Sequence, residues 1–199
     1  MLSHLLDRAN AITSCGIALS ATAILLTLNG DLEFAIAAGL WAMFADQLDG
    51  IVAKQSRNRS ALTAAIGKNL DGFGDLLYGA VLPALVIVMA GQTWAASFLA
   101  VLMVIAGAIR LSYFNAVGLA DGRFYGLPLS YDMPLVAVIF LLRPWVSAET
   151  FGLTLTASFL VVTTLHIAPI KVKAPRGTAY FAIAGVAAVL SMLMLALAP

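Results

Sequence analysis

The sequence is poor in charged residues. Only 11% of its 199 residues are Asp, Glu, Lys or Arg, whereas 62% are hydrophobic. A soluble domain carries about 25–35% charged residues on its surface, so this composition argues against a soluble globular protein. The formal net charge of +1 gives no indication of nucleic-acid binding. The single cysteine, Cys15, excludes an internal disulfide.

Long apolar runs account for the mean hydropathy of +0.98 and are typical of an integral membrane protein. The runs are interrupted by "NGD" at 29–31, "AGQ" at 90–92, "RPW" at 143–145 and "KVKAPRG" at 171–177. We interpret the first run as a membrane helix and not as a cleaved signal peptide. The breaks predict seven helical stretches, at 11–29, 33–54, 69–90, 93–117, 131–145, 151–169 and 178–198.

These stretches predict an all-α fold: a polytopic integral membrane helix bundle with one domain over 1–199 and no separate soluble domain. The fifth stretch, 131–145, is short for a bilayer that asks for about 20 residues. It is expected to start earlier or to lie tilted.

The basic residues predict an orientation. With the N-terminus in the cytoplasm, Arg143 is the one basic residue outside, and the C-terminus is outside if seven spans is right. The reverse orientation breaks the positive-inside rule almost completely. The basic residues then on the cytoplasmic side are Arg8, Lys54, Arg57, Arg59, Lys68, Arg110, Arg123, Lys171, Lys173 and Arg176.

Four of the ten acidic residues fall in one window, "DQLDGIVAKQSRNRSALTAAIGKNLDGFGD" at 46–75. Asp46 and Asp49 are three apart, and Asp71 and Asp75 are four apart, so each pair shares a helix face. Small residues surround them and leave room for close backbone approach or for a ligand. The window predicts a helical hairpin with two acidic faces near its open end.

Four carboxylates near a region of low dielectric constant cannot all stay ionised without cations. An all-oxygen ligand set favours Mg²⁺, Mn²⁺ or Ca²⁺ over zinc. Together with glycines and nearby basic residues, such a site indicates a substrate that contains phosphate. The alternative is that the aspartates cap helix ends and face water. This alternative is favoured for any one aspartate taken alone, but it does not explain why four of them form two stripes in phase.

The window resembles the signature of the CDP-alcohol phosphotransferase family, D-x-x-D-G-x-x-A-R-x8-G-x-x-x-D-x-x-x-D. Seven signature positions are matched, by Asp46, Asp49, Gly50, Ala53, Gly67, Asp71 and Asp75. Two positions depart from it: Lys54 replaces an arginine, and twelve residues instead of eight separate Lys54 from Gly67. Lysine keeps the charge but loses the bidentate fork, and Arg57 or Arg59 is a candidate to replace it.

Other segments are similar to the phosphatidylserine synthase branch of that family. "NLDGFGDLLYGAVLPA" is similar to "LDSLADxxSFGxAPA", "IRLSYFNAVG" to "LRLARFN", and "ANAIT" to "PNxIT". "YGLPLSYDMPLV" follows where the branch has a GLP segment, but Ser130, Tyr131 and Asp132 stand where small residues are usual. This departure bears on the acceptor.

The resemblance implies a six-helix core plus about one extra helix, a homodimer, and a reaction in which the phosphatidyl group of CDP-diacylglycerol passes to a small alcohol, with L-serine favoured. Two divalent ions, Mg²⁺ or Mn²⁺, are expected on Asp46, Asp49 and Asp71, with Asp75 completing the set. Asp75 is also the expected general base. The implied location is the inner, cytoplasmic membrane of a prokaryote, with the active site facing the cytoplasm.

Substrate contacts follow from the same resemblance. The expected acceptor contacts are Arg110, for a carboxylate, together with Asn115 and Asp132. Each of the polar contacts also has a structural alternative. Asn10 and Thr13 would then cap the first helix, Arg110 would anchor the topology, and Asn115 would cap a helix end. Asp132 would pair with Arg123. The expected contacts to the CDP head are Gly50, Ala53, Lys54, Gly67, Asn10 and Thr13.

His166, alone on an apolar helix, is interpreted as packing. Lys171, Lys173 and Arg176 set topology or attract anionic lipid. Three alternatives stay open: the same chemistry with glycerol phosphate, inositol phosphate or another amino alcohol as acceptor; a cation transporter with an intramembrane carboxylate site; and a structural membrane protein.

Overall fold

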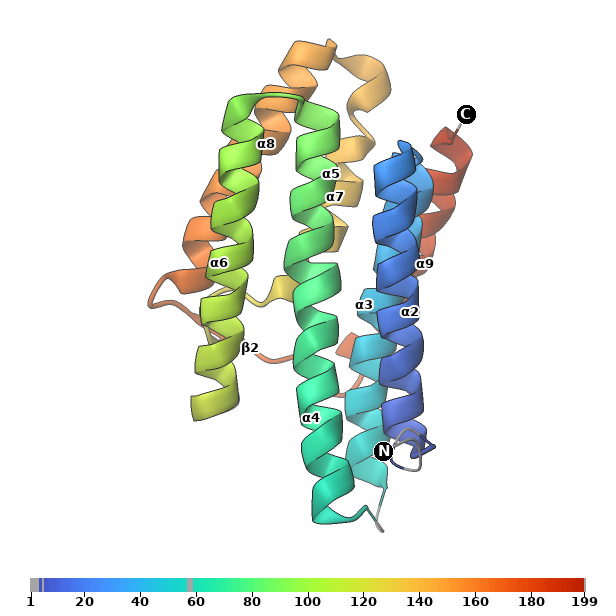
Figure 1. The fold of residues 1–199 in the computed structure, drawn as a ribbon, viewed down its shortest axis with the longest axis vertical. Helices are drawn as coiled ribbons and strands as arrows, with labels where there is room; N and C mark the ends of the chain where they lie inside the picture. The colour runs from blue at the N-terminus through green and yellow to red at the C-terminus, as the bar shows by residue number, and fades with distance from the viewer. Residues whose placement is uncertain (1–3, 5, 57–58, 199) are drawn as a thin grey trace.

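The apolar stretches form long helices in the computed structural model, which describes residues 4, 6–56 and 59–198 (Figure 1). Six helices in this part of the chain are long and apolar enough to cross a membrane, and they confirm the all-α polytopic bundle. They are α2 (Arg8–Asn29), α3 (Leu32–Gln55), the continuous helix Ala61–Gly91, α6 (Trp94–Val117), α8 (Ala148–Ile167) and α9 (Ala179–Leu197).

The helix ends follow the local sequence. Asp7 accepts hydrogen bonds from the amides of Ala9 and Asn10 at the start of α2. Gly30 ends α2 with φ of 90°, a left-handed conformation that glycine adopts without strain. Because α3 begins two residues later, α2 and α3 form a tight antiparallel hairpin.

The third spanning helix contains a π-helical turn. It consists of α4 (Ala61–Leu76), the turn η1 (Leu77–Val81) and α5 (Leu82–Gly91). Pro83 has no amide hydrogen and would crowd the carbonyl of Gly79 in a regular α-helix, and the wider turn relieves that conflict. The helix begins at Ala61, so most of the long segment between Lys54 and Gly67 is helical and the α3–α4 connection is short.

The fifth predicted span, 131–145, is not a full span. The structure has a 3-10 turn η2 (Leu129–Tyr131), the nine-residue helix α7 (Asp132–Phe140) and a second 3-10 turn η3 (Arg143–Trp145). Figure 1 shows α7 starting partway along the bundle and rising to the end where α8 begins. The fifth stretch is therefore helical as predicted, but its helix is half-length, and six of the described helices are long enough to span a membrane.

Two glycines explain why α7 can start inside the bundle. A Cβ atom on Gly79 would lie 2.6 Å from Cβ of Leu129, and one on Gly107 would lie 2.8 Å from Cβ of Ala80. The missing side chains leave a notch between η1 and α6 into which Leu129 inserts. Asp132, three residues further on, is thereby placed in the protein interior, where it is 1% exposed.

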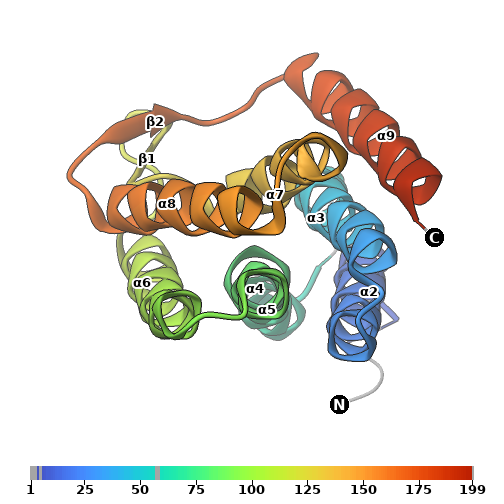
Figure 2. The same cartoon turned by 90° about the horizontal axis from the view of Figure 1, so that it is seen from above.

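The helices pack around a core between α3, α5 and α7. Figure 2 shows α5 between α6 on one side and α2 and α3 on the other, with α9 outermost. Contacts of α9 are made with α3 and α7. Large side chains that are fully buried in this core include Leu40, Met43, Leu82, Met133 and Phe140.

A small sheet, which the sequence did not predict, joins two connecting segments. Strand β1 (Arg123–Tyr125) pairs antiparallel with β2 (Lys171–Lys173), with Phe124 opposite Val172. Figure 2 shows the pair beside α8. It ties the chain that leaves α6 to the chain that leaves α8.

The chain termini lie at opposite ends of the bundle (Figure 1). Glu33, in the first turn of α3, forms an ion pair with Arg143 of η3 near the end where α2 finishes. The α3–α4 connection lies at the other end, with the N-terminus of α2. Arg143 therefore lies at the opposite end of the bundle from Lys54 and Arg59, which flank the α3–α4 connection.

Candidate active site

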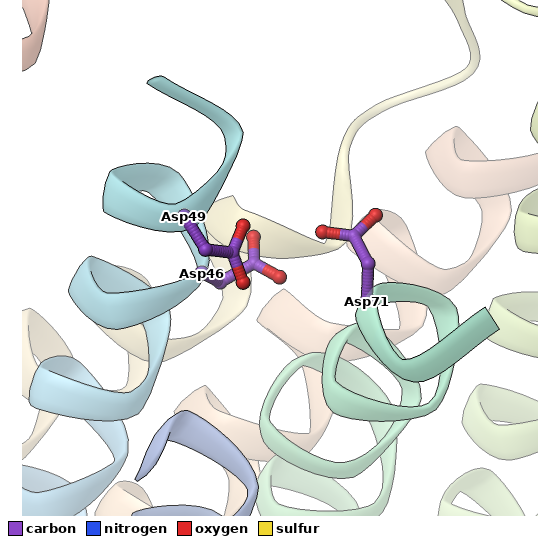
Figure 3. Close-up of side chains that lie close together, drawn as sticks. All are labelled: Asp46, Asp49 and Asp71. Atoms are coloured by element: carbon purple, nitrogen blue, oxygen red, sulfur yellow. The ribbon is translucent and has the colours of Figure 1, made fainter. Parts of the chain in front are cut away.

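Three carboxylates converge between α3 and α4. Asp46 and Asp49 project from α3 and Asp71 projects from α4, and one oxygen of each lies within 4.8 Å of the others. Figure 3 shows the two α3 side chains facing the α4 side chain across the gap between the helices. The i, i+3 spacing puts Asp46 and Asp49 on one face, and the short connection brings α4 opposite that face.

Asp75 lies one turn beyond Asp71 and is joined to the cluster through Tyr78. The Tyr78 hydroxyl lies 2.6 Å from Oδ1 of Asp75 and 2.9 Å from Oδ2 of Asp46. Its single proton can be donated to one of the two at a time. Tyr78 is 1% exposed and lies in η1, so the π-helical turn places its hydroxyl between two carboxylates of different helices.

Thr13 and Asn10, both buried on α2, do not cap the helix, because Asp7 does. The Thr13 hydroxyl forms hydrogen bonds with the Ala9 carbonyl and with Oδ2 of Asp49. It therefore supports one member of the carboxylate cluster from the side of α2.

Asn10 connects α2 to the start of α4. Its amide nitrogen donates to the Thr63 carbonyl at 3.2 Å, and its Oδ1 accepts from Nη2 of Arg59 at 2.6 Å. A Cβ atom on Gly67 would collide with Oδ1 of Asn10 and lie 2.7 Å from that guanidinium nitrogen. The signature glycine thus leaves the space that Asn10 and Arg59 occupy.

Among the described residues, the cation that contacts Asn10 is Arg59 and not Lys54. Nε of Arg59 lies 3.2 Å from Oδ2 of Asp7, and the side chain is 13% exposed. Lys54 is exposed at the end of α3. Arg57, the other candidate to replace the signature arginine, lies outside the described residues.

Open space lies beside the signature glycine of α3. A Cβ atom built on Gly50 would have no neighbour within 4 Å among the described residues. Ala53, one turn further, is partly buried. A ligand group could therefore approach the α3 backbone next to Asp49.

A buried cation extends the site towards α6. Arg110 is 5% exposed, and its guanidinium carbon lies 5.5 Å and 5.3 Å from the ring centres of Phe114 and Phe124. It lies close enough to Asp75 and Asp132 to interact with both electrostatically. Stacking on two rings offsets part of the cost of burying the guanidinium.

Asp132 pairs with His166 and not with Arg123. Nε2 of His166 lies 3.1 Å from Oδ2 of Asp132, and Nδ1 lies 2.8 Å from the Leu127 carbonyl oxygen. His166 is 2% exposed. Its interpretation as packing is therefore incomplete, since the ring is buried but both ring nitrogens also have polar partners.

Asn115 stands apart from this group. It is exposed on the last turn of α6, and its Nδ2 lies 3.3 Å from where a Cβ atom on Gly72 would be. Nζ of Lys68 donates to the Asn115 carbonyl at 2.9 Å. The helix is ended by Gly118, so Asn115 does not cap it.

The carboxylate cluster fits a hard divalent cation. Oδ1 of Asp46 is buried and has no hydrogen-bond partner in the described part of the chain. Such an oxygen is unfavourable unless a cation or a donor meets it. The donor set consists of carboxylate oxygens, which Mg²⁺ and Mn²⁺ prefer. The three residues that converge could therefore hold a metal ion.

Sequence patterns did not identify Tyr78 as part of the site and assigned His166 to packing alone. They left open whether Arg57 or Arg59 replaces the signature arginine. Tyr78 follows Asp75 by three positions, so helical spacing alone places it on the carboxylate face. An ionisable residue within a membrane helix indicates function by default. Applied to His166, this rule would have marked it as a candidate site residue. No local pattern selects Arg59 over Lys54.

Two comparisons with known proteins agree with this geometry. The family model described as CDP-alcohol phosphatidyltransferase matches residues 6–198. Archaetidylserine synthase of Methanothermobacter thermautotrophicus is 30% identical over 160 residues, which are 77% of this chain. The match covers 63% of that protein's length.

Proposed function

Since the chain belongs to the CDP-alcohol phosphatidyltransferase family, we propose that it transfers a phosphatidyl group from CDP-diacylglycerol to the hydroxyl of L-serine, with release of CMP. The observation that carries the proposal is the convergence of Asp46, Asp49 and Asp71 beside the Asp75–Tyr78 pair. Buried Arg110 interacts electrostatically with that pair and with buried Asp132.

The carboxylate cluster would bind the diphosphate through divalent cations. The family supports a divalent metal, and we propose Mg²⁺ or Mn²⁺, two ions, held by Asp46, Asp49 and Asp71 with Asp75 completing the set. Bound there, the ions would neutralise the diphosphate and the charge that develops on the leaving CMP.

Asp75 is proposed as the general base. It would accept the proton of the acceptor hydroxyl as that oxygen forms a bond to the phosphorus that carries the lipid. The bond from this phosphorus to the oxygen of CMP breaks, and CMP leaves with the electron pair. Tyr78 would keep the Asp75 carboxylate oriented through its hydrogen bond of 2.6 Å.

The nucleotide side of the site is proposed to lie along α2, α3 and the start of α4. Gly50 and Ala53 would allow the CDP head to approach the backbone. Asn10 and Gly67 would position Arg59, which would contact phosphate in place of Lys54. Thr13 would orient Asp49 through its hydrogen bond. Lys54, which is exposed, would contact phosphate only at the edge of the site.

The acceptor side is proposed to lie at Arg110 and Asp132, with Asn115 at its outer edge. A guanidinium suits the carboxylate of an amino acid, and Asp132 suits its ammonium group. The name of the archaeal relative, archaetidylserine synthase, supports serine as acceptor. It also makes a CDP-activated archaeol a donor to test beside CDP-diacylglycerol.

The chain is an integral membrane protein, with six apolar helices in the described residues. We propose that it resides in the cytoplasmic membrane of a prokaryote with the carboxylate cluster accessible from the cytoplasm, because Lys54 and Arg59 lie at the α3–α4 connection and Arg143 lies at the opposite end. A homodimer remains a proposal from the family.

The decisive experiment measures CMP release by the purified full-length protein in detergent with CDP-diacylglycerol. Serine, glycerol 3-phosphate, inositol phosphate and ethanolamine are supplied separately, with Mg²⁺, with Mn²⁺ or with EDTA. We expect release that depends on serine and on metal. Stimulation by a phosphorylated alcohol alone would replace the acceptor. Absence of CMP release with every alcohol, together with cation flux into sealed vesicles that contain the protein, would favour the transporter.

The base is tested by Asp75→Asn. Asparagine keeps the shape of the side chain but cannot accept the acceptor proton as a carboxylate does, so we expect kcat to fall by about 10²–10⁴-fold. Asp31→Asn, an exposed change at the start of α3, is the matched control. Full turnover by the Asp75 variant would remove this residue as the base.

A further inference from the structure

We propose that His166 is a positioning residue that fixes Asp132 as the receptor for the acceptor's ammonium group, and that this pair selects a zwitterionic amino alcohol over an anionic one. The inference rests on the proposed function. It assigns a role to a side chain that the sequence pattern gave to packing.

The chain fixes His166 from two directions. Gly126 has φ of 72° and packs directly against the backbone carbonyl of His166. The Gly126 amide donates to the Ile170 carbonyl at 2.9 Å, and the Leu127 amide donates to the Leu165 carbonyl at 2.9 Å. The segment before α7 is thus hydrogen-bonded to the end of α8, and the imidazole has little freedom.

The protonation of the ring follows from its partners. The Leu127 carbonyl oxygen can only accept, so Nδ1 of His166 carries a hydrogen. Nε2 faces Oδ2 of Asp132. One proton therefore lies between His166 and Asp132, and this contact occupies one of the two carboxylate oxygens.

The other oxygen is left for a ligand. Oδ1 of Asp132 is buried and has no hydrogen-bond partner among residues 4, 6–56 and 59–198. Nε of Arg110 is also buried without a partner in the same ranges. Buried polar atoms that lack partners are unfavourable, so an acceptor oxygen and a guanidinium donor together indicate a polar ligand with groups of both kinds.

The charges of the site match those of an amino alcohol. Arg110 interacts electrostatically with both Asp75 and Asp132, so the proposed base and the carboxylate of α7 share one cation. Serine carries a hydroxyl for Asp75, a carboxylate for Arg110 and an ammonium for Asp132. A phosphorylated alcohol would bring two negative charges towards Asp132, and that repulsion would oppose its binding.

The test compares L-serine with 3-hydroxypropanoate, which lacks only the ammonium group. Kinetic constants for CMP release are measured for wild type, Asp132→Asn, His166→Asn and His166→Gln. Where turnover of 3-hydroxypropanoate is slow, its inhibition constant against serine is measured instead. Thr163→Val is the control, because Thr163 is buried one turn earlier on α8 and donates only to the Phe159 carbonyl of its own helix.

We expect Asp132→Asn and His166→Asn to lower kcat/KM for serine by about 10–100-fold, mainly through KM, as for a lost hydrogen bond to a charged group. The constants for 3-hydroxypropanoate should change less than about threefold in the same variants. His166→Gln should recover part of the loss, because its amide nitrogen can take the place of Nε2 and donate to Asp132.

Equal losses with both acceptors would assign His166 a merely structural role and overturn the inference. Wild-type protein that uses both acceptors equally well would overturn it too. Absence of serine-dependent CMP release in wild type would instead refute the proposed function, which separates the two failures. If His166→Asn fails to fold, Asp132→Asn and His166→Gln still decide the result.

Discussion

Tyr78 offers one proton to two carboxylates, Asp75 and Asp46, that come from different helices. The length of the tyrosine side chain lets η1 reach the carboxylate of α3 directly. The hydrogen bond to the proposed base and the alignment of the carboxylate cluster therefore depend on a single hydroxyl.

Tyr78→Phe removes that hydroxyl while the ring keeps filling its buried site. A hydrogen bond to a charged group contributes about 1.5–3 kcal/mol, so we expect kcat to fall by about 10–100-fold. Michaelis constants and the activating metal concentration are measured together with kcat. Tyr113→Phe, on an exposed face of α6, should behave as wild type, and an unchanged kcat in Tyr78→Phe would exclude the orienting role.

The carboxylate stripes could be predicted because their spacing is local: Asp46 with Asp49, and Asp71 with Asp75, share faces on any helix. The partners of His166 could not be predicted in this way. Asp132 is 34 positions away, and their meeting depends on how α7 and α8 pack. The sequence therefore predicts which residues can act together within a helix, and tertiary packing decides which meet between helices.

Among the helices, α7 was the element predicted least well. Its apolar composition matches a membrane helix, and composition alone gives no reason for it to begin inside the bundle. The reason lies in Gly79 and Gly107, which belong to other elements and make the notch for Leu129. The long helices were predicted well because their length and hydropathy suffice.

Gly79→Ala tests the notch. The added Cβ would lie 2.6 Å from Cβ of Leu129 and 3.2 Å from its carbonyl oxygen, so η2 must shift. Overpacking of this kind destabilises by about 1–3 kcal/mol, and we expect a lower midpoint of thermal unfolding together with a higher KM for serine. Gly185→Ala is the matched control.

A Cβ atom on Gly185, in α9, would have no neighbour within 4 Å among the described residues. Alanine there should leave the midpoint unchanged or raise it slightly, since alanine is favoured over glycine in a helix by about 0.5–1 kcal/mol. Equal midpoints for the two variants would show that the notch does not need a glycine.

For the whole molecule, the half-length helix decides on which side of the bundle the chain ends. Six long helices alone would return the C-terminus to the side of the N-terminus. Because α7 carries the chain over the remaining distance, the two termini lie at opposite ends of the bundle (Figure 1). The positive-inside rule likewise predicts that the termini lie on opposite sides of the membrane, and this orientation stays a prediction.

Protease-cleavable tags on the two termini test this topology. In sealed right-side-out vesicles, external protease should remove a C-terminal tag and leave an N-terminal tag intact. Inverted vesicles should give the opposite pattern and serve as the control. Removal of both tags from the same face would show that α7 does not carry the chain across.

The residues proposed for the two halves of the reaction come from separate parts of the sequence, one ending at the notch glycine Gly79 and one following it. The cluster carboxylates and Tyr78 precede residue 80, whereas Arg110, Asp132 and His166 follow it. The side chains proposed for phosphate chemistry and those proposed for acceptor choice thus belong to separate stretches of the polypeptide. The two stretches pack together where Leu129 meets Gly79. Substitutions in the later stretch can change which alcohol is accepted while the earlier stretch keeps its geometry, so products can diversify without a new catalytic centre.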